Sequence, residues 1–494
     1  MKTKTELIKF NQGLDLESGA RLNSFDLMVE TYGELNEDKD NAILVCHAFS
    51  GNHHAAGKSS DSDALGWWDE IIGSGKAIDT DKFFVVCSNN LGGCSGSSGP
   101  LSVNPESGKL YGKDFPLVTV TDWVNSQKLL CDHLGISKWH MVAGGSLGGM
   151  QALQWAISYP NKVKKAGVFA TATRSSTQNI AMNEVGREAI RKDKNFMDGD
   201  YLNHNLKPKN GLKTARMLGH ITYSSEDIMD QKFGRKFQDI KSKIEGTVDY
   251  EVENYLQYKG EKFSDTFDAN SYITLSTAVD YFDIGQNIEQ ITKTLEKSTC
   301  KWLVISFSSD WLYPPYQSEE IVNSLINLDR SVSYSCIKSK AGHDAFLLER
   351  DYGKLSSSFL ENISGSSSTK KTNNISRSST NIFFDERVDL KFITNLVNKN
   401  DRVLDLGCED GTLLYELKEK GCSKLVGVEI DGDPIEKVPE NFWPVFDVNN
   451  KKIGRLSRCF FSPRLKKNIG LAIIDINYTE PETALIIESP KALF

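Results

Sequence analysis

Short hydrophobic runs alternate with longer amphipathic stretches from residue 21 to about residue 350. The runs are nearly continuous in apolar residues, which is typical of strands buried on both faces of a sheet. The stretches between them have helical spacing, and this alternation predicts an α/β fold with a parallel sheet. The predicted strands are Ala42–Ala48, Phe83–Ser88, Trp139–Ala143, Lys165–Ala172, Trp302–Phe307 and Ser331–Ile337.

The pattern changes between about residues 175 and 295. Here the chain is polar and permissive for helices, as in EDIMDQKFGRKFQDIKSK, and it lacks comparable apolar runs. We therefore predict a helical insertion over the sheet, which we call the lid.

A second change of pattern begins at residue 363. The segment 363–380, ISGSSSTKKTNNISRSST, has almost no large apolar residue, so burial cannot offset the entropy of ordering it. We predict a flexible linker that follows a domain spanning residues 1–362. Beyond it, residues 381–431 read as a partial Rossmann-like segment, and residues 432–494 as a β-rich segment.

Composition narrows the class of protein. A chain of 494 residues, 39% hydrophobic and 25% charged, is expected to be soluble and to have more than one domain. Met1–Phe10 does not resemble a secretory signal, so we expect a cytoplasmic location without membrane contact. The net charge of -8 argues against a nucleic-acid partner. The nine cysteines form no CxxC pair or zinc-like spacing, so no metal site is expected.

One motif carries the candidate chemistry. The predicted strand Trp139–Ala143 leads into Gly144-Gly145-Ser146-Leu147-Gly148, and helical spacing follows. A strand, a tight turn with GxSxG and a helix are typical of the nucleophile elbow of α/β-hydrolases. The small neighbours are needed because a strained turn has no room for their β-carbons. Ser146 is therefore the predicted nucleophile, although a plain glycine-rich turn is the alternative.

A serine nucleophile needs a base and a carboxylate that orients the base. In α/β-hydrolases the chain order is Ser, then Asp or Glu, then His. Asp310 follows the predicted strand Trp302–Phe307, and His343 follows the strand Ser331–Ile337. Both lie at carboxyl ends of strands, where open α/β sheets place their sites. They complete the predicted triad, although a helix cap and an ordinary loop histidine would have the same sequence.

The transition state also needs donors for an oxyanion. The backbone N–H of Leu147, directly after the nucleophile, is one predicted donor. The loop after His47, with Phe49 and Gly51, is expected to supply the other, and we assign it to the N–H of Phe49.

Several stretches resemble the homoserine O-acetyltransferase family of the α/β-hydrolase superfamily, in the right order over most of residues 5–355. The stretches NLGGCSGSSGP and GGSLGGMQ are specific to that family and its close relatives, unlike GxSxG alone. The full set of stretches that resemble the family is His47–Gly51, Asn90–Pro100, Gly144–Gln151, Ala215–Met217, His220–Tyr223 and Ala341–Asp344.

The resemblance implies a function and further site residues. Ser146 would take an acetyl group from acetyl-CoA and pass it to the hydroxyl of L-homoserine, a ping-pong reaction of methionine biosynthesis. The family pattern assigns the homoserine carboxylate to Arg216 and the ammonium group to Asp344, which suits their charges. Relatives that use succinyl-CoA have an arginine soon after the triad aspartate, whereas this chain has Leu312. Leu312 therefore predicts acetyl-CoA as co-substrate, with no other cofactor, and relatives suggest a homodimer.

The carboxyl-terminal part resembles two other families. Residues 402–412 and 427–431 resemble the start of a MetW-like methyltransferase, but Glu409 replaces a glycine of the usual turn. The stretch from Trp443 to Gly470 resembles the carboxyl-terminal β domain of aminomethyltransferases. Both pieces are too short for the whole domains, so no independent methyltransferase activity is expected.

Three other functions stay open at this point. Homoserine O-succinyltransferase differs from the main hypothesis only in the acyl donor. A serine esterase would use the same triad with water as acceptor. A noncatalytic protein that recruits a methionine-pathway partner through its tail is the third.

Overall fold

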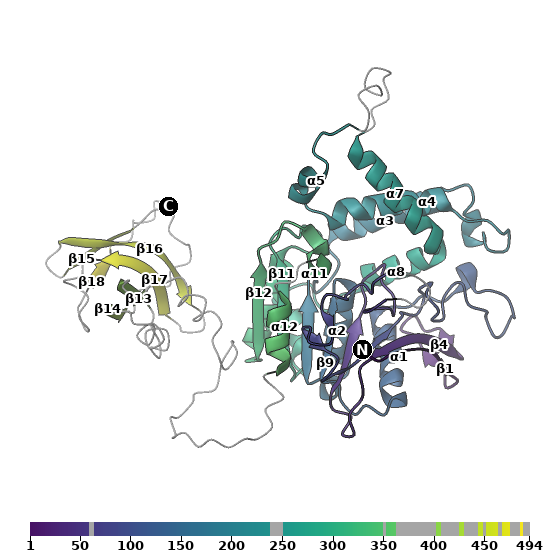
Figure 1. The fold of residues 1–494 in the computed structure, drawn as a ribbon, viewed down its shortest axis with the longest axis horizontal. Coiled ribbons are helices and arrows are strands. Elements are labelled where there is room, and N and C mark those ends of the chain that lie inside the picture. The colour runs from purple at the N-terminus through teal and green to yellow at the C-terminus, as the bar shows by residue number, and fades with distance from the viewer. Residues whose placement is uncertain are drawn as a thin grey trace. The chain divides into compact units, whose positions relative to one another are not determined.

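The computed structural model describes residues 1–58, 64–237, 250–348 and 352–361, together with short strand segments between residues 402 and 487. The chain divides into two compact units, Met1–Ile382 and Phe383–Phe494 (Figure 1). The predicted linker 363–380 and Glu409 lie outside the described residues.

An eight-stranded mixed sheet forms the centre of the first unit, in the order β1-β4-β8-β5-β9-β10-β11-β12. From β8 to β12 the neighbouring strands are parallel, whereas β1 and β4 are antiparallel to their neighbours. The strands are β1 Thr3–Phe10, β4 Phe25–Tyr32, β5 Ala42–Cys46, β8 Phe84–Ser88, β9 Met141–Gly145, β10 Lys165–Phe169, β11 Lys301–Phe307 and β12 Val332–Ile337.

The α/β-hydrolase fold predicted from the sequence is confirmed, with one correction to the sheet. Each predicted strand overlaps an observed one, but β1 and β4 were not predicted and make the sheet mixed rather than parallel. In β4, buried and partly exposed residues largely alternate, as expected for a strand toward the sheet edge with one face less covered. A search for continuous apolar runs misses such strands.

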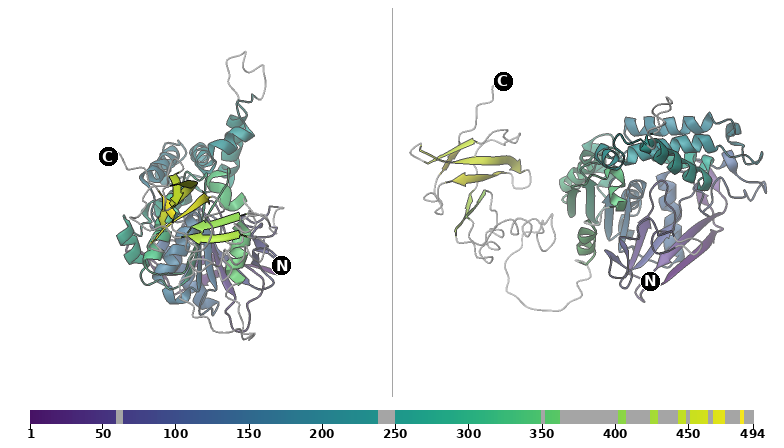
Figure 2. Two further views of the ribbon diagram at one scale, coloured as in Figure 1. Left: turned by 90° about the vertical axis from the view of Figure 1, so that its left-hand side faces the viewer. Right: turned by 45° about the horizontal axis from the view of Figure 1, so that its top comes forward.

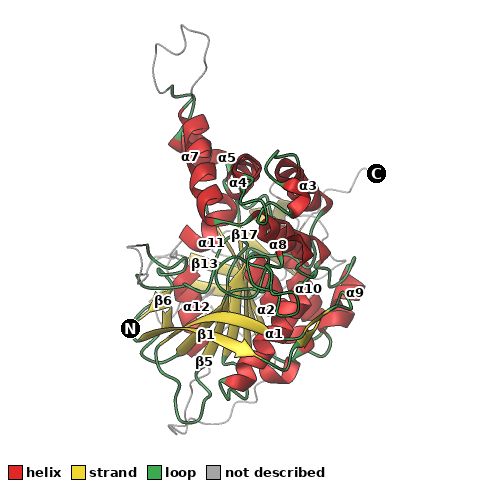
Figure 3. Cartoon of the chain, turned by 90° about the vertical axis from the view of Figure 1, so that its right-hand side faces the viewer, coloured by secondary structure: helices red, strands yellow, loops and turns green. Residues whose placement is uncertain are grey.

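Helices cover both faces of this sheet. Helix α12 (Tyr352–Glu361) lies on one side, while α1, α2, α9 and α10 lie on the other (Figure 3). Their bounds are α1 Val120–His133, α2 Leu147–Ser158, α9 Ile288–Leu295 and α10 Pro315–Asn327. Helix α1 begins at a capping box, in which the Thr119 and Asp122 side chains each accept from the other's backbone N–H.

The end of α12 is fixed by a buried lysine. Lys165 at the start of β10 is 0% exposed, and its Nζ donates to the carbonyl oxygens of Phe359 and, at 2.9 Å, Leu360. These carbonyls belong to the last turn of the helix, which has no intrahelical donors for them. Lys165 therefore acts as a cap brought from the sheet.

The lid consists of helices at one end of the sheet (Figure 2). The elements are α3 Thr177–Arg191, α4 Lys209–Tyr223, α5 Glu226–Lys232, α7 Glu251–Thr266 and α8 Ala269–Tyr281. Helix α9 was included in the predicted lid, but it packs against α10 and α2 and so belongs with the sheet layers.

The second unit contains one six-stranded sheet in the order β14-β13-β17-β16-β15-β18. The β13–β14 pair is parallel and the other pairs are antiparallel. Because β13 pairs with β17, strands from both predicted segments, 381–431 and 432–494, join one sheet. The strands are β13 Arg402–Leu406, β14 Lys424–Val428, β15 Trp443–Asp447, β16 Lys452–Ser462, β17 Lys467–Ile474 and β18 Leu485–Ile487.

Candidate active site

Ser146 lies at the sharp turn between β9 and α2. Its φ is 56°, a left-handed conformation that non-glycine residues adopt rarely and at a cost. The turn is held because the Ser146 N–H donates to the Phe169 carbonyl at 2.9 Å, and Thr171 Oγ1 donates to the Ser146 carbonyl at 2.7 Å. The backbone therefore has the strained geometry expected of a nucleophile elbow.

The glycines around Ser146 allow close approach of other segments. A β-carbon on Gly148 would lie 2.0 Å from the Cys46 carbonyl oxygen, and one on Gly144 would lie 2.4 Å from the Gly148 backbone. A β-carbon on Gly145 would lie 2.2 Å from the ring of Phe346. Phe346 belongs to α11 (Ala345–Leu348), directly after His343, so Gly145 lets the histidine segment pack against the elbow.

The histidine and aspartate predicted for the triad are hydrogen-bonded. His343 Nδ1 lies 2.8 Å from Asp310 Oδ2, and both residues are 3% exposed. The other oxygen, Asp310 Oδ1, accepts from the backbone N–H groups of Leu312 at 3.0 Å and Tyr313 at 2.9 Å. With Asp310 fixed in this way, the imidazole presents Nε2 as its free nitrogen.

The electrostatics of this pair favour a protonated imidazole. Burial alone would lower the pKa of His343, but the charge of Asp310, its hydrogen bond and the charge of Asp344 outweigh burial and raise the pKa above its usual value. His343 is therefore a stronger base than an isolated imidazole, as a group that takes a proton from serine needs to be.

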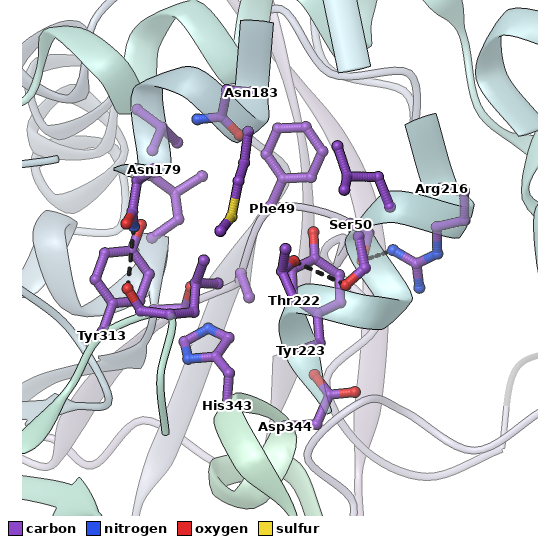
Figure 4. A pocket seen from close by; sticks show the side chains of 18 of the residues that line it. Phe49, Ser50, Asn179, Asn183, Arg216, Thr222, Tyr223, Tyr313, His343 and Asp344 are labelled. Atoms are coloured by element: carbon purple, nitrogen blue, oxygen red, sulfur yellow. Dashed lines mark hydrogen bonds between the residues drawn. The ribbon is translucent and has the colours of Figure 1, made fainter. Parts of the chain in front are cut away.

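Ser146 and His343 line one pocket of about 920 Å³, part of which is open to solvent (Figure 4). Leu147, the first residue of α2, and Phe49 line the same pocket, so the residues of both predicted oxyanion donors share it with the serine. The Phe49 ring packs edge-on against Tyr272 of the lid, with ring centroids 5.1 Å apart. The lid thus closes over the loop that carries Phe49.

A buried histidine supports this loop. His47 Nε2 accepts from the Asn90 backbone N–H at 3.1 Å, so Nδ1 carries the proton that faces the Ala48 carbonyl at 2.8 Å. Burial lowers the pKa of His47 to about 4, so the ring is neutral near pH 7. The sequence placed His47 at the end of a strand and in a stretch that resembles the family, but not in this supporting role, because the role depends on Asn90, which is distant in the chain.

Arg216 and Asp344 lie beside the predicted triad. Arg216 on α4 donates from Nη1 to Ser50 Oγ at 3.1 Å, and its guanidinium lies over the Phe263 ring, 4.8 Å from the centroid. Burial raises the pKa of Asp344, and the positive charges of His343 and Arg216 oppose this rise. Figure 4 shows Tyr223 between the two side chains. Among the described residues, one guanidinium and one carboxylate thus line the pocket next to His343.

Leu312 and two lid amides line another part of the pocket. The Leu312 carbonyl accepts from Asn179 Nδ2 at 3.2 Å, and Asn183 Nδ2 donates to Asp280 Oδ1 at 2.7 Å. Sequence analysis missed both asparagines because α3 has no motif. The two asparagines are four residues apart and so lie on one helix face, which was the one sequence feature that could have indicated a shared role.

Two general observations apply to the described residues. None of them forms a group of three or more His, Cys, Asp or Glu arranged to hold a metal ion. None of their helices is both long and apolar enough to span a bilayer.

Fold and site together define an α/β-hydrolase with a Ser, His and Asp constellation, and the family model described as "alpha/beta hydrolase fold" matches residues 41–350. A homoserine O-succinyltransferase of Neisseria gonorrhoeae is 53% identical over 359 residues, covering 72% of this chain and 95% of the relative. The chain therefore belongs to the homoserine O-acyltransferase family and is an acyltransferase. This result removes the noncatalytic alternative.

Two solved structures extend the comparison. Homoserine O-acetyltransferase from Bacillus anthracis has a TM-score of 0.68 and 29% identity, covering 73% of this chain and 98% of that one. Esterase E22 has a TM-score of 0.66 and 31% identity, covering 73% and 100%. The acyltransferase fold is thus shared with an esterase.

The second unit matches two further family models. The methionine biosynthesis protein MetW matches residues 387–442, and the glycine cleavage T-protein C-terminal barrel domain matches residues 424–493. Both resemblances predicted from the sequence are confirmed, and the two matches overlap at residues 424–442.

Proposed function

We propose that this protein transfers an acyl group from an acyl-CoA to the hydroxyl of L-homoserine in methionine biosynthesis. The assignment of homoserine as the acyl acceptor rests on Arg216 and Asp344, which lie beside His343 in one pocket. A guanidinium suits a carboxylate and a carboxylate suits an ammonium group, so the pair matches both charges of an amino acid. The hydroxyl of homoserine would then face His343.

The residues divide the reaction into two steps. His343 takes the proton of Ser146 while Oγ attacks the thioester carbonyl, and the N–H groups of Phe49 and Leu147 stabilise the oxyanion. The C–S bond breaks, and the CoA sulfur leaves with the proton from His343. Homoserine then gives its hydroxyl proton to His343 while its oxygen attacks the carbonyl carbon of the acyl-serine. The bond between the acyl group and Ser146 Oγ breaks, and His343 returns the proton to Ser146.

For the acyl donor we propose succinyl-CoA, in place of the acetyl-CoA predicted from Leu312. The relative at 53% identity is named a succinyltransferase, whereas the acetyltransferase of known structure is 29% identical. An uncharged Leu312 does not exclude a carboxylate, because neutral N–H groups also bind carboxylates. The amide nitrogens of Asn179 and Asn183 each have a second N–H besides the one used in their hydrogen bonds.

Turnover with succinyl-CoA and acetyl-CoA, at saturating homoserine, tests the donor. We expect a higher kcat/KM for succinyl-CoA and a fall in that preference in Asn183→Ala. Asp280 keeps its 2.7 Å contact with Arg187 in this variant, so the fold should persist. A higher kcat/KM for acetyl-CoA in the wild type would reject the succinyl proposal and restore the prediction from Leu312.

Hydrolysis is the second candidate, because esterase E22 shares the fold with a TM-score of 0.66. The same acyl-serine would be attacked by water where the lid leaves the pocket open. CoA release measured with and without homoserine separates the two functions. Release that does not depend on homoserine would favour the esterase.

A further inference from the structure

Three lysines on the lid lie beyond Arg216, outside the pocket lining. Lys259 and Lys262 are on α7 and Lys232 ends α5, and we call them the lysine cluster. On α7, Tyr255, Lys259 and Lys262 follow at spacings of four and three, so they share one helix face. Figure 1 shows α4, α5 and α7 together in the lid.

Ring contacts bring these segments to one place. Tyr255 packs against Phe233, the residue after Lys232, with ring centroids 4.8 Å apart. Tyr255 Oη also lies 3.3 Å from His220 Nδ1 on α4, and Lys259 Nζ lies 5.7 Å from the Tyr255 ring centroid. Phe263 is on the same helix as Lys259, and the guanidinium of Arg216 lies over its ring. The cluster therefore adjoins the predicted homoserine site.

The positive charge of the cluster is not balanced by ion pairs in the described part of the chain. No salt bridge there involves Lys232, Lys259 or Lys262. The nearby Glu261 is paired with Lys213 at 2.8 Å, and Glu253 accepts from the Tyr250 backbone N–H at 2.8 Å. This concentration of cations occurs in a chain whose net charge is -8.

The cations also act on one another. Burial and then the charges of Arg216, Lys262 and Lys232 lower the pKa of Lys259, and the charge of Asp344 opposes this fall as the smallest contribution. Burial and the charges of Arg216, Lys259 and Lys232 lower the pKa of His220 to about 3. An anion bound among these groups would relieve the repulsion, so the arrangement favours an anionic ligand.

Resting on the proposed function, we infer that the lysine cluster binds the phosphate groups of the acyl-CoA donor. Arg216 and Asp344 already match the charges of homoserine, which leaves the lysines for another anion. The donor carries its phosphates at the far end of a flexible arm, away from the thioester at Ser146. A cationic surface outside the pocket lining holds those phosphates while the arm reaches the serine.

The test compares two acyl donors in the double variant Lys259→Gln/Lys262→Gln. The KM for acyl-CoA should rise about fivefold, since exposed charge pairs contribute modestly, while kcat and the KM for homoserine stay unchanged. The acyl thioester of N-acetylcysteamine has no phosphate, so its KM should not change. Lys209→Gln is the control, because Lys209 lies on α4 and pairs with Asp265 at 2.6 Å.

Salt dependence gives a second readout that needs no shortened donor. The KM for acyl-CoA should rise with ionic strength more steeply in the wild type than in the double variant. An unchanged KM for acyl-CoA, an equal loss with both donors, or equal salt slopes would each overturn the inference. Wild-type enzyme that forms no O-acylhomoserine would instead reject the proposed function, so the two failures are distinguishable.

Discussion

The two units of this chain differ in how many parallel strands end at one edge of a sheet. In the first unit β8, β5, β9, β10, β11 and β12 are parallel neighbours. Ser146 follows β9, Asp310 follows β11 and His343 follows β12, so separate strand ends deliver the site. In the second unit only the β13–β14 pair is parallel among the described strands.

Among the described strands, the first unit has the arrangement in which open α/β sheets carry their sites. Ligands of open α/β sheets bind beyond the carboxyl ends of neighbouring parallel strands. Among the described strands of the second unit one pair is parallel, and β17 pairs antiparallel with β13 where a further parallel strand would continue a Rossmann-like sheet. Within the MetW match at residues 387–442, the described strands are this one parallel pair.

Loss of Ser146 is the largest expected effect and tests whether all acyl transfer belongs to the first unit. Ser146→Ala should lower kcat by about 10⁶-fold, because the variant lacks the hydroxyl on which the acyl-enzyme forms. Steady-state formation of O-acylhomoserine measures it, with Ser158→Ala, at the end of the same helix, as control. Retention of more than a tenth of the activity would contradict the assignment of acyl transfer to the first unit.

Arg216→Lys should have the next largest effect. A lysine keeps the charge but loses the two-pronged geometry that binds a carboxylate, so the KM for homoserine should rise about tenfold. The rate of CoA release in the first half-reaction, measured without homoserine, should stay unchanged. A slower first half-reaction would show that Arg216 serves the donor as well.

The pH dependence of the first half-reaction sharpens the assignment of His343. The imidazole must be neutral to accept a proton, and its pKa is raised above 6.5. The rate should therefore fall as pH drops through a midpoint above 6.5, by about tenfold per pH unit below it. Asp344→Asn removes one of the charges that raise this pKa, so the midpoint should move to lower pH. An unmoved midpoint would contradict the electrostatic account.

Changes in the second unit should have the smallest effect on catalysis. Proline at position 470 removes a backbone donor from β17, which lies between β13 and β16, so Gly470→Pro should disrupt that sheet. We expect kcat/KM to change by less than about twofold, since the described residues that line the pocket all belong to the first unit. Limited proteolysis should show faster cleavage of the second unit alone. A large loss of activity would mean that the two units depend on each other.

The structure brings together the candidate residues predicted from the sequence, whereas the strands at one edge of the sheet were not predicted. Ser146, Asp310 and His343 follow buried strands, and parallel strands bring their ends together, so chain order was sufficient. Strands β1 and β4 were missed because they lie toward an edge of the sheet and pair antiparallel. Phe49 was predicted from its place in the loop after His47 and Arg216 from the family pattern, and both residues line the pocket.

What the sequence could not supply were contacts between distant segments. Asn179 and Asn183 lie on a lid helix without a motif, and only the folded chain brings them beside Leu312. The support of the Phe49 loop by His47 likewise depends on Asn90. The prediction of acetyl-CoA from Leu312 considered a single position, whereas Asn179 and Asn183 also line the pocket.

The buried lysine beneath α12 has a practical consequence for dissecting this enzyme. A chain shortened after residue 362 keeps the carbonyls of Phe359 and Leu360, and with them the partners of Lys165. A chain shortened before Phe359 would remove both carbonyl partners of Lys165, whose pKa burial already lowers to about 7, and should destabilise the first unit. The smallest fragment that still folds is therefore set by a residue at the start of β10, far from the cut in sequence.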